Sequence, residues 1–401
     1  MVAGTIVETR DRTWSPVLER LSAPALDCVQ TGLAALADLH HGPGTHLWLG
    51  ARLGFAPSTA PDRPPTMEAP VDQRLAEARD LVGLRVAERR DGLDGPALRK
   101  FAAEAGTLYV VADAFTMLWT PYRGQRHMDH SFLLVPGDDR HTVVDPYHNE
   151  TQWGTARPGV WRLTESDLDT AVGAACSAMV IVPDQRPELN PAAVLAANAR
   201  AMTDAESAID RYLAQVRAGL DREEGVEALV LDVWLLGRSR LLHTAWLETV
   251  PEVPPLHLEV AQEQSWDWLR LASQSYLGLR RVQRGAELPS SVMEQFEELF
   301  AGDVEIASRL SAALADVAVV PQEIRDVVVE VVRSTLGLDD GGEQSFRSLS
   351  NFNSFRLVDI IEQVETRLGV DLDGDDLTVD ALRDVETLAR LFARAARRAG
   401  G

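Results

Sequence analysis

The spacing of apolar residues divides the chain into three regions, and the first, up to about residue 185, mixes strand-like and helix-like segments. Short apolar runs bounded by Gly, Pro or Asp predict strands there. They read TLYVVADAF at 107–115, SFLLVPG at 131–137, HTVVDPY at 141–147 and AACSAMVIVPD at 174–184. The GDDR sequence between the second and third runs predicts a hairpin turn. The proline-rich stretch at 55–70 predicts a loop.

From about residue 186 to 318 apolar residues recur every three or four positions, and strand signals are scarce. Long helices are predicted to begin near Thr203, Gly225 and His257, with the breaker PEVPP before the last of them. This pattern is typical of a small helical bundle. Its four tryptophans, which we expect mostly in the core, are Trp234, Trp246, Trp266 and Trp268.

Beyond about residue 319 the pattern stays helical but becomes acidic. Residues 321–390 contain 16 Asp or Glu and 7 Arg, a net charge of −9. The amphipathic sequences PQEIRDVVVEVVRSTLG, SFRLVDIIEQVETRLG and VETLARLFARAARR predict helices, and a long polar loop separates the first two. This shift in composition indicates a separately folded region.

The bulk composition narrows the classes of partner. A chain of 401 residues is too long for one ordinary core. The formal net charge of −22 disfavours nucleic acid and anionic membranes as partners through simple repulsion. Because we find neither a run of about 18 apolar residues nor a signal-peptide core, we expect a cytoplasmic protein. Two cysteines predict neither a disulfide framework nor a metal site.

Ser354 lies at the predicted start of an acidic amphipathic helix. Unpaired backbone N–H groups and the helix dipole favour a phosphate at such a position. A plain capping serine is the alternative reading. Along its length the helix would bury apolar residues at helical spacing and expose carboxylates. The apolar set is Leu357, Val358, Ile361, Val364 and Leu368, and the acidic set is Asp359, Glu362 and Glu365.

This last region resembles an acyl or peptidyl carrier protein. The resemblance rests on a first amphipathic helix, a long loop, a serine heading an acidic second helix, and the run LGVDLDGDDLTVDALRDVETLARLF. The family's Asp-Ser-Leu appears here as Asn353, Ser354 and Phe355, so a charge is lost while the capping geometry is kept. The resemblance implies a covalent 4′-phosphopantetheine on Ser354, installed by a phosphopantetheinyl transferase, and an acidic helix that docks partner enzymes.

A nucleophile is predicted in the first region. Cys28, in ALDCVQTG, precedes an Ala/Leu-rich helical stretch whose N-terminus should lower the thiol pKa, whereas Cys176 lies in an apolar run typical of packing. A nucleophilic cysteine needs a base and a residue that orients the base. His130 opens one predicted strand and Asp145 closes the next, so a hairpin could bring them together.

Some alternatives stay open at this site. His127 and His148 flank the predicted base, and Asp129 could face it as well as Asp145. We expect backbone N–H groups at the start of the Cys28 helix to hold an oxyanion, with the Gln30 side chain as a weaker candidate.

The order DCVQTG, HSFLLV and VVDP resembles the papain-like fold, and most closely the butirosin-pathway acyltransferase family. Together the patterns and resemblances predict an α+β protein. A papain-like cysteine domain would occupy 1–185, a helical domain 186–318 and a four-helix acyl carrier domain 319–401.

The resemblances imply a cysteine-dependent acyltransferase of natural-product biosynthesis. It would move an acyl or aminoacyl group from the Ser354 phosphopantetheine through Cys28 to a small-molecule amine. His130 would serve as base and Asp145 would orient it. An adenylating ligase or an upstream carrier would load the arm, and homo-oligomer formation is left open. Two rivals remain: a thioesterase or peptidase-type hydrolase, and a non-catalytic carrier platform.

Overall fold

The computed structural model describes residues 7–60, 63–318, 320–337, 346, 353–373, 377, 382 and 384–400. Contacts divide the chain into two compact units. The first contains Met1–Thr249 and Leu258–Ala307, and the second contains Val250–His257 and Ser308–Gly401. The two regions predicted as papain-like and helical domains therefore share one unit. The region predicted as a carrier domain accounts for most of the other.

A mixed helix-and-sheet unit comes first in the chain, as the predicted α+β class requires. In the described residues its main sheet has seven strands, and every pairing between neighbours is antiparallel. In spatial order they are β1 (Val7–Glu8), β10 (Gly159–Leu163), β7 (His141–Asp145), β6 (Asp129–Val135), β5 (Leu108–Asp113), β11 (Cys176–Pro183) and β4 (Leu84–Leu93).

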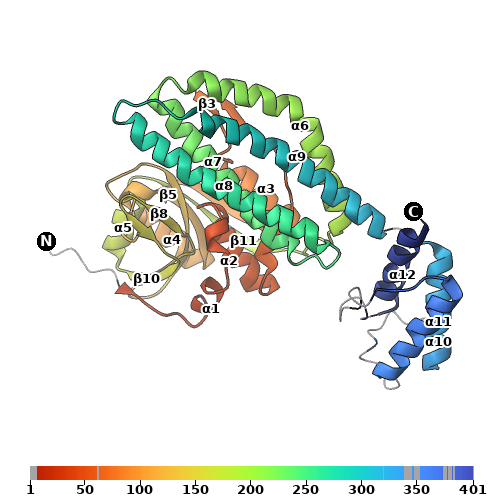
Figure 1. The fold of residues 1–401 in the computed structure, drawn as a ribbon. Helices are drawn as coiled ribbons and strands as arrows, with labels where there is room; N and C mark the ends of the chain where they lie inside the picture. Colours follow the sequence, from red (N-terminus) through yellow and green to blue (C-terminus); the bar gives the residue numbers. More distant parts are fainter. Residues whose placement is uncertain are drawn as a thin grey trace. The chain divides into compact units, whose positions relative to one another are not determined.

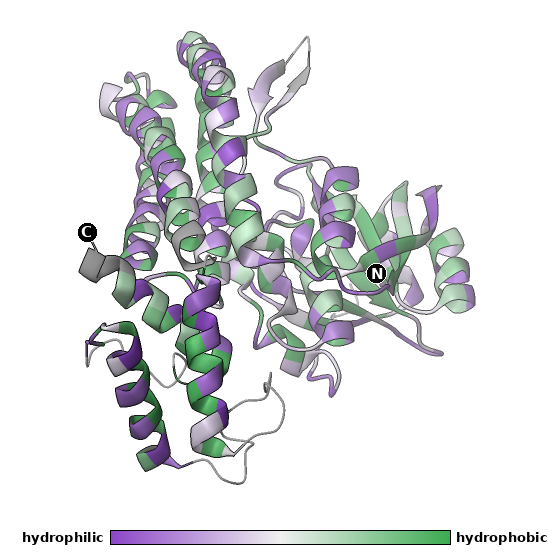
Figure 2. Cartoon of the chain, turned by 90° about the vertical axis from the view of Figure 1, so that its right-hand side faces the viewer, coloured by the Kyte–Doolittle hydropathy of each residue, from purple (hydrophilic) through white to green (hydrophobic). Residues whose placement is uncertain are grey.

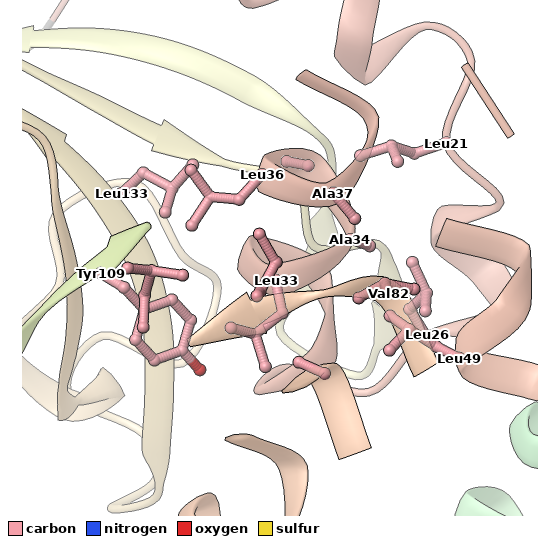
Figure 3. Packing of buried hydrophobic residues seen from close by; sticks show 14 of the residues in the cluster. Leu21, Leu26, Leu33, Ala34, Leu36, Ala37, Leu49, Val82, Tyr109 and Leu133 are labelled. Atoms are coloured by element: carbon pink, nitrogen blue, oxygen red, sulfur yellow. The ribbon is translucent and has the colours of Figure 1, made fainter. Parts of the chain in front are cut away.

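Alternation of side chains along these strands builds a core on each face of the sheet. Tyr109 and Leu133 pack against α2 (Gln30–His41), whose Leu33 and Leu36 point to the sheet (Figure 3). The neighbouring strand residues face the other way and pack against α4 (Gly95–Ala105) and α5 (Glu165–Val172). The short helix α1 (Ser15–Leu18) and α3 (Val71–Val82) complete the α2 side.

Four long helices follow the sheet in the chain (Figure 1). They are α6 (Pro191–Gly219), α7 (Glu223–Leu247), α8 (Pro255–Val282) and α9 (Ser290–Ala318). Edge-to-face aromatic rings form their core, with Trp268 of α8 against Phe296 and Phe300 of α9. Helix α7 is buried around most of its circumference, between the other helices and the 3₁₀ turns η1 (Ala23–Ala25) and η2 (Thr45–Gly50), and its buried residues include Asp232, Arg238 and Arg240.

The second unit has its own core around α10 (Gln322–Leu336), α11 (Ser354–Leu368) and α12 (Val385–Gly400). Along these helices hydrophobic and hydrophilic residues are both present, and the hydrophobic ones recur every three or four positions, as in an amphipathic helix (Figure 2). Glycines in left-handed conformation, Gly337 and Gly369, end α10 and α11. The predicted short third helix of the carrier fold lies in a stretch that is largely outside the described residues.

The four predicted strands and the hairpin between β6 and β7 are confirmed, and three other expectations are wrong. The proline-rich stretch contains a small hairpin, β2 (Ser58–Ala60) and β3 (Arg63–Thr66). It is anchored because Thr66 Oγ1 and the Met67 N–H both donate to buried Asp232 of α7, each at 2.8 Å. The first bundle helix begins at Pro191, capped by Asn190, rather than near Thr203. Trp266, expected in the core, is 60% exposed.

The elements β8 (Asn149–Thr151) and β9 (Gly154–Ala156) form a second small hairpin after β7.

Among the described helices, none combines the length and the apolar run needed to cross a bilayer.

Gly32 of α2 tests how tightly the helix that follows Cys28 packs on the sheet. A Cβ at this position would lie 2.9 Å from Cε2 of Tyr109. That ring is fixed because its hydroxyl donates to the Val29 carbonyl at 2.8 Å. We expect Gly32→Ala to destabilise the first unit by about 1–3 kcal/mol, despite the better helix propensity of alanine. Urea unfolding of this unit measures the change. Gly54→Ala, with nothing within 4 Å, is the control and should be nearly neutral.

Candidate functional site

Cys28 lies in the turn that leads into α2, and both its backbone carbonyl and its thiol form hydrogen bonds with β6. Its carbonyl accepts from Ser131 Oγ at 2.6 Å, and its thiol donates to the Asp129 carbonyl at 3.4 Å. The side chain packs against a small buried cluster that includes Ala114, Tyr122 and Tyr147. The predicted nucleophile is therefore fixed beside the first residues of β6, the strand that carries the predicted base.

His130 and Asp145 form a buried pair on neighbouring strands. His130 Nε2 lies 2.7 Å from Asp145 Oδ2, and both side chains are almost fully buried. Asp145 also accepts from Trp119 Nε1 at 2.8 Å and from the Tyr147 N–H at 3.0 Å. Three donors thus fix the carboxylate, and the carboxylate fixes the ring. An imidazole held in this way presents its other nitrogen, Nδ1, for chemistry.

Nδ1 of His130 is buried and has no hydrogen-bond partner among the described residues. The ring stands edge-on to Tyr147, with 5.1 Å between ring centroids, and Cys28 packs against the same tyrosine. In the described chain, however, the thiol donates to the carbonyl next to His130 and not to the imidazole itself. Such contacts often tighten only when substrate binds. The structure thus brings all three predicted residues into one neighbourhood, with the His–Asp contact formed and the Cys–His contact open.

The competing histidine, His127, lies in a different environment. It pairs with Asp113 at 2.5 Å and stacks on Phe115, but its side chain is 73% exposed. Asp129, the competing carboxylate, is exposed at the start of β6, and its carbonyl oxygen rather than its side chain meets Cys28. Burial and an open second nitrogen therefore favour His130 as the base.

The expectation of a low thiol pKa at Cys28 is wrong. Burial raises the pKa of this thiol well above its usual range, and the negative charges of Asp27, Glu68 and Asp145 raise it further, while Arg238 opposes them. The helix N-terminus cannot compensate because Asp27 already occupies it. Its carboxylate accepts from the N–H groups of Val29 and Gln30, at 2.9 and 2.7 Å. The resting thiol is therefore neutral.

The same contacts occupy the backbone N–H groups of Val29 and Gln30 and so take them out of the expected oxyanion hole, while the amide N–H₂ of the Gln30 side chain is not part of these contacts. The N–H groups at the start of α2 are bound to Asp27, and the Gln30 side-chain oxygen accepts from the Asp27 N–H at 3.3 Å. Two other donors remain near the thiol. The Cys28 N–H has no partner in the described residues. The hydroxyls of Tyr122 and Tyr147 lie 3.3 Å apart, and a mutual hydrogen bond uses only one of their two protons.

Arg238, on α7, is a site residue that the sequence analysis missed. Its guanidinium is buried, donates to the Leu26 and His148 carbonyls at 2.6 Å each, and lies over the ring of Trp234. Leu26 precedes Cys28 and His148 follows Asp145, so one side chain from the helical region ties both halves of the site. Two arginines inside the apolar sequence WLLGRSRLL are a signal, because arginine is rarely buried without a partner.

Ser354 is the first residue of α11, in the second unit. The N-cap is Asn353, whose Oδ1 accepts from the Arg356 N–H at 3.0 Å. The helix start is therefore capped by the residue before the serine. Phe355 and Val358 are 82% and 51% exposed, which corrects the expectation that Val358 would be buried. Ile361 and Val364 are buried as expected.

Comparison with protein-family models and with curated proteins finds no match for this sequence. The roles of Cys28, His130, Asp145 and Ser354 therefore rest on the residues and their geometry.

Replacing Arg238 should loosen the site. Arg238→Met leaves buried carbonyls without their charged donor, so we expect a loss of about 2–4 kcal/mol in the free energy of unfolding of the first unit. Arg238→Lys keeps the charge but cannot reach both carbonyls, so its free energy of unfolding should lie between those of the unchanged protein and of Arg238→Met. Urea unfolding measures both. Arg200→Met, at an exposed position of α6, is the control and should change little.

The neutral thiol predicts a distinct pH profile for alkylation. Because the Cys28 pKa is raised, the thiolate fraction is small at neutral pH. The rate of modification by iodoacetamide should climb steadily from pH 7 to above pH 9, with no plateau. His130→Ala should slow it about tenfold or more near neutral pH by removing the proton acceptor, and His127→Ala should not. Peptide mass spectrometry separates Cys28 from buried Cys176. A plateau reached by pH 7 would restore the low-pKa thiolate.

Proposed function

We propose that the protein is a cysteine-dependent acyltransferase whose acyl donor is a thioester carried on its own second unit. The observation that carries the proposal is the open Nδ1 of His130, buried beside a half-buried cysteine and held by Asp145. A buried imidazole nitrogen without a partner calls for an explanation. His141, His243 and His257 also have such a nitrogen in the described residues, but among these four only His130 is held by a carboxylate and lies beside a cysteine. A thiol that must lose its proton in the reaction is a suitable partner.

In the proposed first step, Cys28 Sγ attacks the thioester carbonyl of a phosphopantetheine arm on Ser354. The thiol proton passes to Nδ1 of His130, and Asp145 stabilises the resulting imidazolium. The Cys28 N–H and the spare tyrosine hydroxyl proton stabilise the oxyanion. As the carbonyl re-forms, the pantetheine thiolate leaves and takes the proton from His130. One thioester has replaced another, so the step is nearly balanced.

In the second step an amine attacks the acyl-Cys28. His130 accepts the ammonium proton and returns it to the Cys28 sulfur as this leaves, and the amide product is the stable end point. Donor and acceptor share Cys28, so the reaction is ping-pong. Placing the carrier on the same chain raises the effective concentration of the donor.

Hydrolysis of the same acyl-enzyme is the second candidate. Cys28 packs against a small cluster of apolar and aromatic side chains, and Met128 and Trp234 border the same cluster, which consists of Ala114, Tyr122, Tyr147 and Ala156. Such walls favour an organic acceptor over bulk water, which supports transfer. A non-catalytic carrier platform would not need a buried His–Asp pair whose imidazole has an unpaired nitrogen, so the pair favours catalysis.

Loading experiments test the carrier half of the proposal. Treatment with coenzyme A and a broad phosphopantetheinyl transferase should add one arm, read as the mass increase of the intact protein. Ser354→Ala should abolish the increase. Ser350→Ala, at a position outside the described residues, is the matched control and should keep it. Equal labelling of the Ser354→Ala protein contradicts the assignment.

Acyl movement tests the catalytic half. With an acetyl-pantetheine arm on Ser354, an acetyl group should appear on Cys28, and Cys28→Ala should hold it on the arm. His130→Ala should slow the transfer by about 10²–10⁴-fold. An arm discharged at an unchanged rate in the Cys28→Ala protein sinks the acyltransferase proposal.

A further inference from the structure

The C-terminal half of α8 exposes a face that is both apolar and cationic, on a protein of strongly negative charge. Leu277 is 59% exposed and Tyr276 is 38% exposed. One turn later come Arg280 and Arg281, and Arg284 follows in the turn after the helix; all three are exposed. Arg280 donates only to glutamine side chains, and Arg281 and Arg284 form no ion pair within the described residues. We name this cluster of five residues the α8 face, and none of its three guanidinium groups pairs with a carboxylate in the part of the chain that the structure describes.

The α8 face lies next to the cysteine site. Arg280 Nη1 donates to Gln152 Oε1 at 3.3 Å, in the turn between β8 and β9. The next residue, Trp153, is 37% exposed and packs its ring against Tyr122, with 6.2 Å between centroids. Tyr122 is part of the cluster around Cys28. A group bound on the α8 face is therefore separated from the cysteine by the rim residue Trp153 and the wall residue Tyr122.

The helix α11 carries the complementary pattern. Its exposed apolar residues Phe355 and Val358 come first, and the exposed carboxylates Asp359 and Glu362 follow one turn later. On both helices, exposed apolar residues are followed one turn later by charged residues, which are arginines on α8 and carboxylates on α11. From Phe355 to Asp359 and from Leu277 to Arg281 the spacing is four residues, or about 6 Å along either helix. The patterns match when the helices run in the same direction.

We propose that the α8 face is the docking surface for α11 of the same chain when the Ser354 arm delivers its acyl group. This inference rests on the proposed function. Phe355 and Val358 would cover Leu277 and Tyr276, and Asp359 and Glu362 would meet Arg281 and Arg284. Ser354, one residue before Phe355, then lies at the end of the contact that is nearer to Tyr276. Charge complementarity would chiefly set how fast the helices associate, and the apolar contact would fix their register.

A crosslinking reaction tests this docking without knowledge of the natural acyl group. A bromoacetyl-pantetheine arm is installed on Ser354 from the corresponding coenzyme A analogue. Cys28 sulfur displaces bromide to form a thioether, and its proton passes to His130 or to solvent. Arg281→Glu with Arg284→Glu should slow the crosslink about tenfold at low ionic strength, and added salt should shrink the difference. The control Arg200→Glu with Arg211→Glu makes the same charge change on exposed positions of α6 and should leave the rate unchanged.

A charge swap sharpens the test. Asp359→Arg with Glu362→Arg, once loaded, should be slow by itself and recover when combined with the α8 double variant. Free bromoacetamide should modify Cys28 equally in all variants, because it needs no docking. If it does, and the crosslink rate ignores the α8 charges, the docking inference is overturned while the proposed function stands. Failure to install the arm on Ser354 overturns both. Faster crosslinking between loaded Cys28→Ala and Ser354→Ala chains than within one chain overturns docking within the chain.

Discussion

The buried guanidinium of Arg238 is the contact on which the site depends. It reaches from α7 to the carbonyls of Leu26 and His148, which belong to separate loops of the sheet region. The first loop carries the cysteine and the second follows the aspartate. Together with the hydrogen bonds between Cys28 and β6, this shared donor fixes the predicted nucleophile relative to the His130–Asp145 pair. The contact is one of several that join the sheet region and the long helices within one compact unit, beside those of Asp232 with Thr66 and of His243 with the Gly50 carbonyl.

The residues buried around Cys28 also determine the protonation of its thiol. The carboxylate of Asp27 closes the N-terminus of α2 and forms an ion pair with Arg74 at 2.6 Å, so the helix dipole acts on Asp27 rather than on the thiol. A neutral thiol is less reactive toward water-borne electrophiles than a thiolate. In the proposed mechanism it becomes nucleophilic when an acyl carbonyl is in place and His130 can take the proton. The site therefore suits a donor delivered to it more than one met by chance in solution.

Features with a strong local pattern could be predicted from the sequence, whereas features that depend on contacts between distant residues could not. Strands β5, β6, β7 and β11 are continuous apolar runs buried on both faces, so their pattern is strong. Strand β4 was missed because its sequence LRVAERRDGL is largely exposed and charged. The hairpin of β2 and β3 was missed because its anchor, Asp232, lies 166 residues away from Thr66. The His130–Asp145 pair was predictable from a local hairpin. Arg238 joins the site only through tertiary packing.

The pKa of the Cys28 thiol could not be predicted from the position of the residue before a helix. The sequence places Cys28 before a helix, which in isolation favours a thiolate. Yet the residue before it, Asp27, can fold back on the same N–H groups, and a carboxylate satisfies two of them at once. With two more carboxylates near by, a second negative charge on sulfur is unfavourable until a proton acceptor is engaged. That arrangement couples loss of the thiol proton to attack, because a free thiolate would have to exist beside Asp27 and Asp145. An imidazole with an open nitrogen, fixed by Asp145, is the group that makes this coupling workable.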